Sequence, residues 1–565
     1  MASLAVFGFA DWSELQLALA GLLGLAGIYL LANSIRRAAH DMDAIPGPWR
    51  KALPVVGNLL DCLRPDFHKV LLKWADDYGG VVRIKFLWKD ALIVTDPQAL
   101  ASIMGRGEGA LDKAAGMYST INYMCDPHGA PNLLTGAATD TWKAIRRAVA
   151  VSFSTQNIKK KYPLILSRIN ELVARVAAQG PAASVDVDQA ALRVTLDVIG
   201  LAGFGHDYRS VKQDSPAYDH LLRVLPRCFT EVMLRVANPL RQLAPGYFKG
   251  GDKGSKAFDM FQAEMRVLLE EMKARGPPAP GDQDIASQLY RVMQEHPEVD
   301  EARVMSEIGI LFVEGFETTG HTTAWTLLHA ATCPGVQERV AEELDAAGLL
   351  AKPGCPPPRE MDYEDLKKLP YLTAVAKEAM RMLPVVSLMG RVTSRPVRIG
   401  GYTVPAGVVV GTPLYAIQNT KRNWDAPHEF RPERWLDVPV ETYVYNSKAG
   451  CGGGGGGGSP KAASKLAAAA AASKEGIAFM PFSDGPRSCV GQSLAKAEVM
   501  TLLAKILGSF KLELAPEMGG LEGVLAREST HLTLQTRGTK GIRMRCTPRS
   551  EHVAAGVACQ SAAAE

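Results

Sequence analysis

The sequence has no CxxC pair, because its nine cysteines are scattered along 565 residues. This spacing argues against a zinc site and against a disulfide framework. Acidic and basic residues nearly cancel to a formal charge of +4, so the chain lacks the basic surplus typical of nucleic-acid-binding proteins. It also has no glycine-rich fingerprint for a flavin or a nicotinamide cofactor. No shift in composition marks a boundary between two folded domains.

The composition that remains is that of a large globular protein with one hydrophobic run. Hydrophobic residues make up 47% of the chain and charged residues 22%, which is enough for a sizeable core. Residues 15–32 contain a single polar residue, Gln16, and are long enough to span a bilayer. A cleaved signal peptide is the alternative, but its apolar region is usually shorter and preceded by positive charge.

Charges on either side of this run predict its orientation. Asp11 and Glu14 precede it, whereas Arg36 and Arg37 follow it. The positive-inside rule then places the following residues in the cytosol. We therefore expect residues 1–14 to be lumenal and residues 15–35 to form a single transmembrane anchor.

The rest of the chain predicts a mainly α domain with a minor β portion. Residues 80–95 and 389–413 have the pattern of short strands with glycine and proline turns. Helices are expected over 157–178, 187–203, 256–275, 302–331, 364–383 and 492–507. We expect one domain over 36–545, with a low-complexity Gly/Ala insertion at 449–476 and a flexible tail at 546–565.

The segment EGFETT places two acids and an alcohol on one helical face. Glu314, Glu317 and Thr318 are spaced i, i+3 and i+4 within an apolar stretch, where charged groups are costly unless they are used or paired. An acid beside an alcohol can relay protons into a dry pocket. The alternative is that the acids reach solvent and that Thr318 donates to the carbonyl four residues earlier. Gly315 would let a large group approach the backbone.

Two further pairs are weak signals when taken alone. In KEAMR, Glu378 and Arg381 lie three residues apart and can form an ion pair, to which Arg434 of FRPERW could add a second guanidinium. In TWKAIRRAV, Trp142 and Arg146 lie one turn apart and could hold an anion between an indole N–H and a guanidinium. The alternative for Trp142 is a half-buried side chain beside a solvated arginine.

The segment FSDGPRSCVGQ (482–492) displays one cysteine on a tight loop. A helix is expected to begin at once, over 492–507. Because a helix N-terminus favours negative charge, this position is expected to lower the pKa of the Cys489 thiol and to favour a thiolate.

In chain order these motifs are a hydrophobic anchor, a proline elbow, WxxxR, EGxETT, ExxR, PERW and FxxGxRxCxG. Together they resemble the membrane-anchored, microsomal type of the cytochrome P450 monooxygenases, over residues 12 to 545. The most specific element is the cysteine loop, in which every fixed position of the family signature is present: Phe482, Gly485, Arg487, Cys489 and Gly491.

The resemblance implies a role for each motif. Cys489 would be the axial thiolate ligand of the iron of haem b, and the two loop glycines would allow close packing around it. The haem propionates would pair with Trp142, Arg146, Arg391 and Arg487. Glu378, Arg381 and Arg434 would form a buried structural triad. Glu317 and Thr318 would be the catalytic acid–alcohol pair that delivers protons.

The same resemblance implies partners, location and substrate class. Electrons would come from a membrane-bound NADPH-dependent flavoprotein reductase, with cytochrome b5 as a second donor, at the cytosolic face of the endoplasmic reticulum. One atom of O2 would enter a lipophilic substrate by hydroxylation or epoxidation. Glu314 before the helix glycine resembles the fatty-acid ω-hydroxylase branch, in which this residue can form an ester with a haem methyl. Sterols, carotenoids and terpenoids are the alternative substrates.

Two other functions share this resemblance. An isomerase or dehydratase that does not use O2 would be expected to lack the acid–alcohol pair. A non-catalytic haem-binding protein would keep the thiolate and need no proton relay. The presence of Glu317 and Thr318 favours the monooxygenase.

Overall fold

The computed structural model describes residue 24 and residues 40–555, except 54–55, 88, 106–109, 213–215, 239, 437–477, 531 and 539–540. Apart from residue 24, the predicted lumenal segment and anchor lie outside the described residues, as does the Gly/Ala insertion at 449–476. Within the described part of the chain, no helix is both long enough and apolar enough to cross a bilayer.

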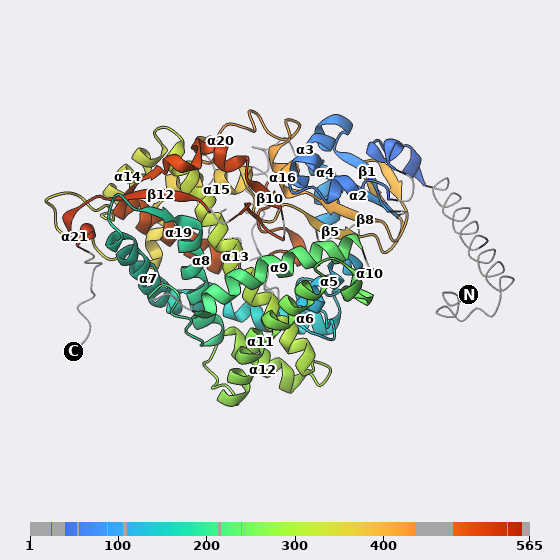
Figure 1. Cartoon of the computed structure of the whole chain (residues 1–565), viewed down its shortest axis with the longest axis horizontal. Coiled ribbons are helices and arrows are strands. Elements are labelled where there is room, and N and C mark those ends of the chain that lie inside the picture. Colours follow the sequence, from blue (N-terminus) through green and yellow to red (C-terminus); the bar gives the residue numbers. More distant parts are fainter. Residues whose placement is uncertain are drawn as a thin grey trace, which may run out of the picture.

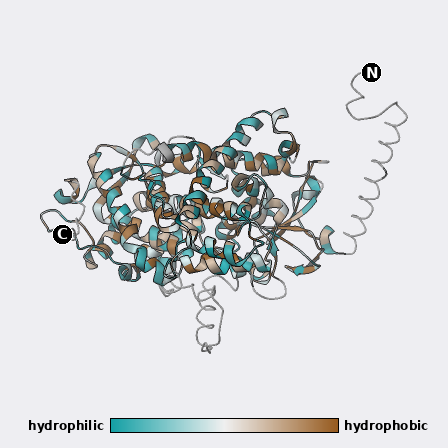
Figure 2. Cartoon of the chain, turned by 90° about the horizontal axis from the view of Figure 1, so that it is seen from below, coloured by the Kyte–Doolittle hydropathy of each residue, from teal (hydrophilic) through white to brown (hydrophobic). Residues whose placement is uncertain are grey.

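The chain forms mainly helices with a minor β portion, which confirms the predicted fold class. Figure 1 shows the largest sheet and helices α3 and α4 gathered on one side, with the long helices filling the rest of the molecule. Figure 2 shows hydrophobic and hydrophilic residues alternating along these helices. The principal core joins residues from the helical part, and two smaller cores lie around the sheet.

The largest sheet has five strands in the order β1-β2-β8-β5-β3. Its strands are β1 (Val81–Phe86), β2 (Lys89–Val94), β3 (Asp112–Lys113), β5 (Met389–Val392) and β8 (Val409–Thr412). The two segments predicted as strands therefore pair with each other, through a parallel β2–β8 contact. β3 adds an unpredicted edge and places Lys113 directly opposite Arg391.

Smaller sheets complete the β portion. One has the order β4-β12-β9, and the pairs β6-β7 and β10-β11 form two more. These strands are β4 (Ser184–Asp186), β6 (Val397–Ile399), β7 (Tyr402–Val404), β9 (Phe510–Leu514), β10 (Glu528–Thr530), β11 (Leu534–Thr536) and β12 (Arg543–Pro548).

Helix α13 (Glu301–Thr332) runs through the centre of the molecule (Figure 1). Its 32 residues span about 48 Å at 1.5 Å per residue. Asp300 caps its first turn by accepting the backbone N–H of Arg303. Gly315 and Gly320 allow close packing. A Cβ on Gly315 would lie 2.7 Å from Ile199, and one on Gly320 would lie 2.6 Å from Leu192. The group that approaches Gly315 is therefore another part of the chain, the π-helical turn η4 (Ile199–Phe204).

The remaining helices precede or follow α13 along the chain, and several of them pack against it. Those before it are α2 (Leu59–Cys62), α3 (Phe67–Tyr78), α4 (Pro97–Met104), α5 (Ala115–Cys125), α6 (Asp140–Ser152), α7 (Thr155–Ala178), α8 (Val187–Val198), α9 (Pro216–Ala237), α10 (Leu240–Leu243), α11 (Gly251–Arg275) and α12 (Ile285–Glu295). Those after it are α14 (Val336–Ala346), α15 (Pro370–Met382), α16 (Leu414–Asn419), α19 (Gln492–Ser509), α20 (Gly520–Leu525) and α21 (Glu551–Ala554).

Several boundaries differ from the prediction for identifiable reasons. The helix expected over 187–203 changes at Ile199 into the π-helical turn η4. The helix expected over 364–383 is a short 3-10 helix, η6 (Tyr363–Lys368), followed by α15, whose first residue is Pro370. Folding also continues past residue 546, where the flexible tail was predicted to begin, because β12 reaches Pro548 and α21 follows it.

Candidate active site

The cysteine loop is a tight turn held by backbone hydrogen bonds. The N–H of Cys489 donates to the carbonyl of Phe482 at 2.8 Å, and the N–H of Gly491 is directed at the sulfur. Gly485 has φ +66°, and a Cβ there would lie 2.0 Å from the carbonyl oxygen of Met104. The loop therefore requires glycine at position 485, whereas a Cβ on Gly491 would meet only the Phe153 ring, at 3.6 Å.

The electrostatics of Cys489 differ from the expectation based on its position before a helix. Burial raises the pKa of its thiol to about 11, and the negative charge of Glu314 acts in the same direction. The Gly491 N–H and the charges of Arg146 and Lys496 oppose this rise without overcoming it. The residue is nevertheless exposed, so its sulfur borders open space instead of lying in the packed core. A thiolate here needs a further positive partner, such as a metal ion.

The four residues expected to bind propionates lie around this loop. Trp142 and Arg146 come from α6, Arg391 from β5, and Arg487 from the 3-10 helix η9 (Gly485–Arg487). The Arg146 guanidinium donates to the Ser488 carbonyl at 2.7 Å, so it supports the loop directly. The Arg487 guanidinium stacks 3.9 Å from the centre of the Trp142 ring. The Trp142 indole N–H, expected to meet an anion, instead donates to the Leu133 carbonyl at 3.1 Å.

Asp112 and Lys113 on β3 are part of this cluster and were missed by the sequence analysis. The Nε of Arg487 donates to the Asp112 carboxylate at 2.8 Å. Burial and the charge of Arg391 lower the pKa of Lys113 to about 7, although Glu314 and Asp112 oppose this effect. Only the register of β3 against β5 brings these residues to the site, so no local sequence signal could have found them.

The cationic cluster formed by Lys113, Arg391 and Arg487 fits a ligand that carries carboxylates. All three side chains are largely buried, and Asp112 is the carboxylate hydrogen-bonded within the cluster. The Nη1 of Arg487 is buried without a hydrogen-bond partner among the described residues. Because buried cations are costly unless paired, this arrangement suits two further carboxylates, which the propionates of haem would supply. The residues present therefore fit a haem group facing Cys489.

On α13, the predicted acid–alcohol face begins at Glu314, whose charge acts on both Lys113 and Cys489. Glu314 is half-buried, and burial raises the pKa of its carboxyl to about 7 despite the opposing charge of Lys113. Glu317 is buried. The Thr318 hydroxyl donates to the Glu314 carbonyl at 2.8 Å, which is the local bond named above as the alternative. With its hydrogen directed there, the Thr318 oxygen can still accept a hydrogen bond from another group.

The predicted triad exists as a dense hydrogen-bond network. The carboxylate of Glu378 accepts two bonds from Arg381, both at 3.0 Å, and one from Nε of Arg434 at 2.9 Å. The backbone N–H of Arg431 and the indole N–H of Trp435 add bonds at 3.0 and 2.9 Å. Trp435, the tryptophan of PERW, therefore supplies a hydrogen bond that phenylalanine at this position could not make.

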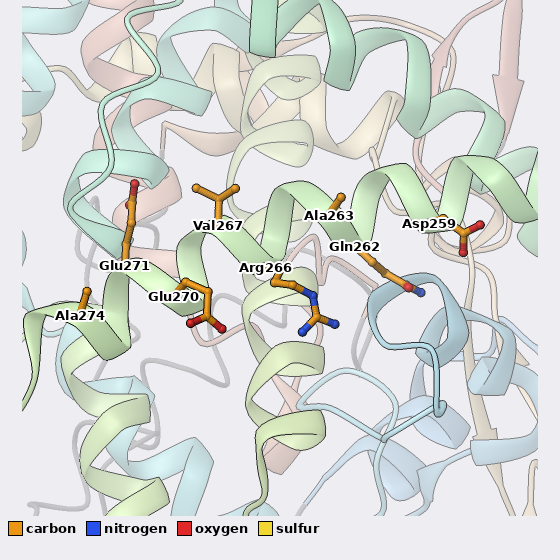
Figure 3. A pocket seen from close by; sticks show the side chains of 8 residues that line it. All are labelled: Asp259, Gln262, Ala263, Arg266, Val267, Glu270, Glu271 and Ala274. Carbon is orange, nitrogen blue, oxygen red and sulfur yellow. The ribbon is translucent and has the colours of Figure 1, made fainter.

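A groove of about 670 Å³ lies away from these residues (Figure 3). It is lined by one face of α11 alone, and Arg266 and Glu270 point to the same side of that helix. None of its lining residues belongs to an element of the cysteine loop, the cationic cluster or the triad. The groove is therefore not part of the candidate active site.

Comparison with known proteins agrees with this geometry. The family model described as Cytochrome P450 matches residues 46–523. Among similar proteins, geranylhydroquinone 3''-hydroxylase of Arnebia euchroma is 25% identical over 91% of this chain and 96% of its own length. Cytochrome P450 3A6 of Oryctolagus cuniculus is 22% identical over 87% and 90%, and ganoderic acid synthetase of Ganoderma lucidum is 24% identical over 88% and 93%. The chain belongs to the cytochrome P450 family and is a monooxygenase of the oxidoreductase class.

Proposed function

We propose that the protein is a haem–thiolate monooxygenase of the endoplasmic reticulum, with fatty acids as its first candidate substrates. Cys489 would ligate the haem iron, and the cationic cluster would hold the propionates together with Arg146. Trp142 would act indirectly, by stacking against the Arg487 guanidinium. Bound haem supplies the redox chemistry that activates O2 and inserts one of its atoms into substrate. The observation that carries this proposal is the exposed sulfur of Cys489 on its tight loop, beside the buried cation of Arg487, whose Nη1 has no hydrogen-bond partner among the described residues.

The protein's own residues would position these groups and manage protons. Arg146 braces the cysteine loop through the Ser488 carbonyl. Glu317 would take protons up, and Thr318 would accept a hydrogen bond at the reacting face of α13 and direct the proton onward. Electrons would come singly from an NADPH-dependent flavoprotein reductase, with cytochrome b5 as a second donor.

The carbon-monoxide difference spectrum of the reduced protein tests the thiolate assignment. Wild type is expected to give a strongly red-shifted Soret band, and Cys489→His to lose it while retaining folded protein. Cys333→Ser is a matched control, because Cys333 terminates α13 and no predicted role involves its thiol. A wild-type band at the position of histidine-ligated haem in folded protein would refute the assignment.

The fatty-acid proposal rests on Glu314. Its carboxyl is protonated in part at neutral pH, since its pKa is about 7, and it occupies the position at which the ω-hydroxylase branch forms an ester. The ester would keep haem with the polypeptide during acid–solvent extraction, and Glu314→Gln would release it. Free extraction of haem from wild type would exclude the ester.

Two of the similar proteins are named for other lipophilic compounds, geranylhydroquinone and ganoderic acid. A terpenoid or prenylated substrate is therefore the second candidate. Spectral titration of the purified protein with dodecanoic acid and with geranylhydroquinone separates the two. A shift of the Soret band with geranylhydroquinone alone would overturn the fatty-acid proposal and leave the monooxygenase assignment intact.

Membrane attachment is proposed from the hydrophobic run at 15–35, with the catalytic domain at 36–545 facing the cytosol. Exposed apolar side chains on and beside α10 support it: Leu240, Leu243 and Tyr247 are 63%, 81% and 91% exposed. Such side chains are expected where a folded domain rests on a lipid surface. Replacing all three with serine should increase the fraction of a protein lacking residues 1–39 that stays in solution when mixed with vesicles.

A further inference from the structure

A second group of charges lies on α13, one turn beyond Thr318. His321 is buried, and its Nδ1 lies 2.7 Å from an oxygen of Asp188, which belongs to the first turn of α8. Its other ring nitrogen, Nε2, lies 3.7 Å from Oε1 of Glu317, too far for a hydrogen bond. That Nε2 and the second oxygen of Glu317 are both buried without a hydrogen-bond partner among the described residues.

The charge of this group follows from its surroundings. Burial opposes the imidazolium form, but the Asp188 carboxylate and then Glu317 outweigh burial and raise the pKa of His321 to about 10. His321 is therefore a cation at neutral pH. The Asp188 side chain is 13% exposed, so this pair also connects the inner face of α13 with the protein surface at the start of α8.

We propose that the Asp188–His321 pair is the counter-ion of Glu317 and keeps it an ionised, correctly placed proton acceptor beside Thr318. This inference rests on the proposed catalytic role of Glu317 and Thr318. Asp188 orients the imidazolium through Nδ1, and the imidazolium then presents Nε2 to the carboxylate. His321 is a positioning residue, because it acts through Glu317.

The other charges around Glu317 make this counter-ion necessary. Glu314 lies one turn earlier on the same face of α13 and repels a second negative charge. Lys113 of β3 and Tyr118 of α5 interact with Glu314, and Asp188 is the charged group that α8 presents to His321. Without His321, two carboxyls would share a buried face and Glu317 is expected to bind a proton.

The experiment compares His321→Gln and Asp188→Asn with Thr195→Val as a matched control. Thr195 lies on α8 and donates a hydrogen bond to the Phe316 carbonyl of α13 at 2.9 Å, so its loss loosens the same helix pair without removing a charge. The first measurement is the infrared C=O stretch of protonated Glu317 in the holoprotein. It is taken as the difference between His321→Gln and the double variant that also carries Glu317→Gln, because Glu314 is itself partly protonated at neutral pH. The second is the pH dependence of O2 uptake driven by NADPH and a flavoprotein reductase, without added substrate.

His321→Gln is expected to show the protonated-acid band at pH 7. In its pH profile, the part in which the rate of O2 uptake rises with pH (the rising limb) should move to higher pH by about 1–3 units. Asp188→Asn should move the limb in the same direction by less, because Nδ1 keeps a hydrogen-bond acceptor. Thr195→Val should do neither. If His321→Gln shows no band and an unshifted limb, or if Thr195→Val reproduces the shift, the pair has only a structural role and the proposal is wrong.

These measurements separate this inference from the proposed function. A wild-type protein without thiolate-ligated haem would defeat the proposed function, yet the infrared band would still report whether His321 controls the protonation of Glu317. Conversely, red-shifted carbon-monoxide spectra with an unchanged limb in His321→Gln would defeat this inference alone.

Discussion

Replacing Glu378 with glutamine removes one negative charge from the centre of the buried triad while preserving side-chain shape. Glu378 and Arg381 are both fully buried. The guanidinium of Arg381 also donates to the backbone carbonyls of Gln418 and Pro427, at 2.8 and 2.9 Å. These contacts hold α15 against the segment that leads to PERW. In the variant these bonds remain, but the two arginines lose their counter-charge.

The magnitude follows from burial. Removing one partner of a buried ion pair typically costs about 3–5 kcal/mol, because the other charge is left uncompensated in a poorly solvated place. An exposed pair, by contrast, contributes about 0–1 kcal/mol. Glu433 supplies that comparison, since it is 50% exposed, lies next to Arg434, and pairs with the exposed Arg339. Glu433→Gln should therefore leave stability almost unchanged.

The pH dependence gives an independent check. Burial acts to raise the pKa of Glu378, but the hydrogen bonds and charge of Arg381 outweigh it and hold that pKa below its usual value of 4.5. The folded state then binds fewer protons than the unfolded state, so this contribution is fully present above pH 4.5 and is lost as pH falls through the lowered pKa. The stability difference between wild type and Glu378→Gln should shrink in the same range.

The assay is equilibrium unfolding in urea at pH 7, followed by tryptophan fluorescence, with Glu433→Gln as control. A double variant, Glu378→Leu with Arg381→Leu, should lose less stability than the sum of the two single variants, because both charges leave together. A loss below about 1 kcal/mol in Glu378→Gln, or strict additivity in the double variant, would show that the arginines are not destabilised by losing the Glu378 charge and would contradict this prediction.

Two further predictions concern the cysteine loop and the cationic cluster. Gly485→Ala should fail to retain haem, because residue 485 has φ +66° and its Cβ would lie 2.0 Å from a backbone oxygen. Gly491→Ala should fold normally by circular dichroism, because the atom nearest to its Cβ would lie at 3.6 Å. Equal behaviour of the two variants would contradict this prediction. Lys113→Met should release haem to a scavenging globin roughly 10-fold to 100-fold faster, as expected for losing a charge-assisted hydrogen bond of about 1.5–3 kcal/mol. The same change should reduce the gain in stability of haem-free protein between pH 7 and 10.5, where the unfolded state binds the extra proton; an unchanged pH dependence would contradict the lowered pKa of Lys113.

The short-range features of this protein could be derived from its sequence. The long helix α13, the pairing of Glu378 with Arg381, and the cysteine loop before α19 all depend on residues within a few positions of one another. Local spacing determines which side chains share a helical face, so such predictions need no knowledge of the fold. The family signature around Cys489 belongs to the same class, since its positions are nearly contiguous.

The tertiary structure alone decided what surrounds these features. Lys113 meets Arg391 because a two-residue strand pairs at the sheet edge, and Asp188 meets His321 across 133 residues of sequence. Burial also reversed a local expectation, because a helix N-terminus favours a thiolate but the enclosed site raises the pKa of Cys489 to about 11. Desolvation and long-range charge depend on every neighbour in space. The sequence therefore determined which residues carry the chemistry, whereas packing determined their charges and partners.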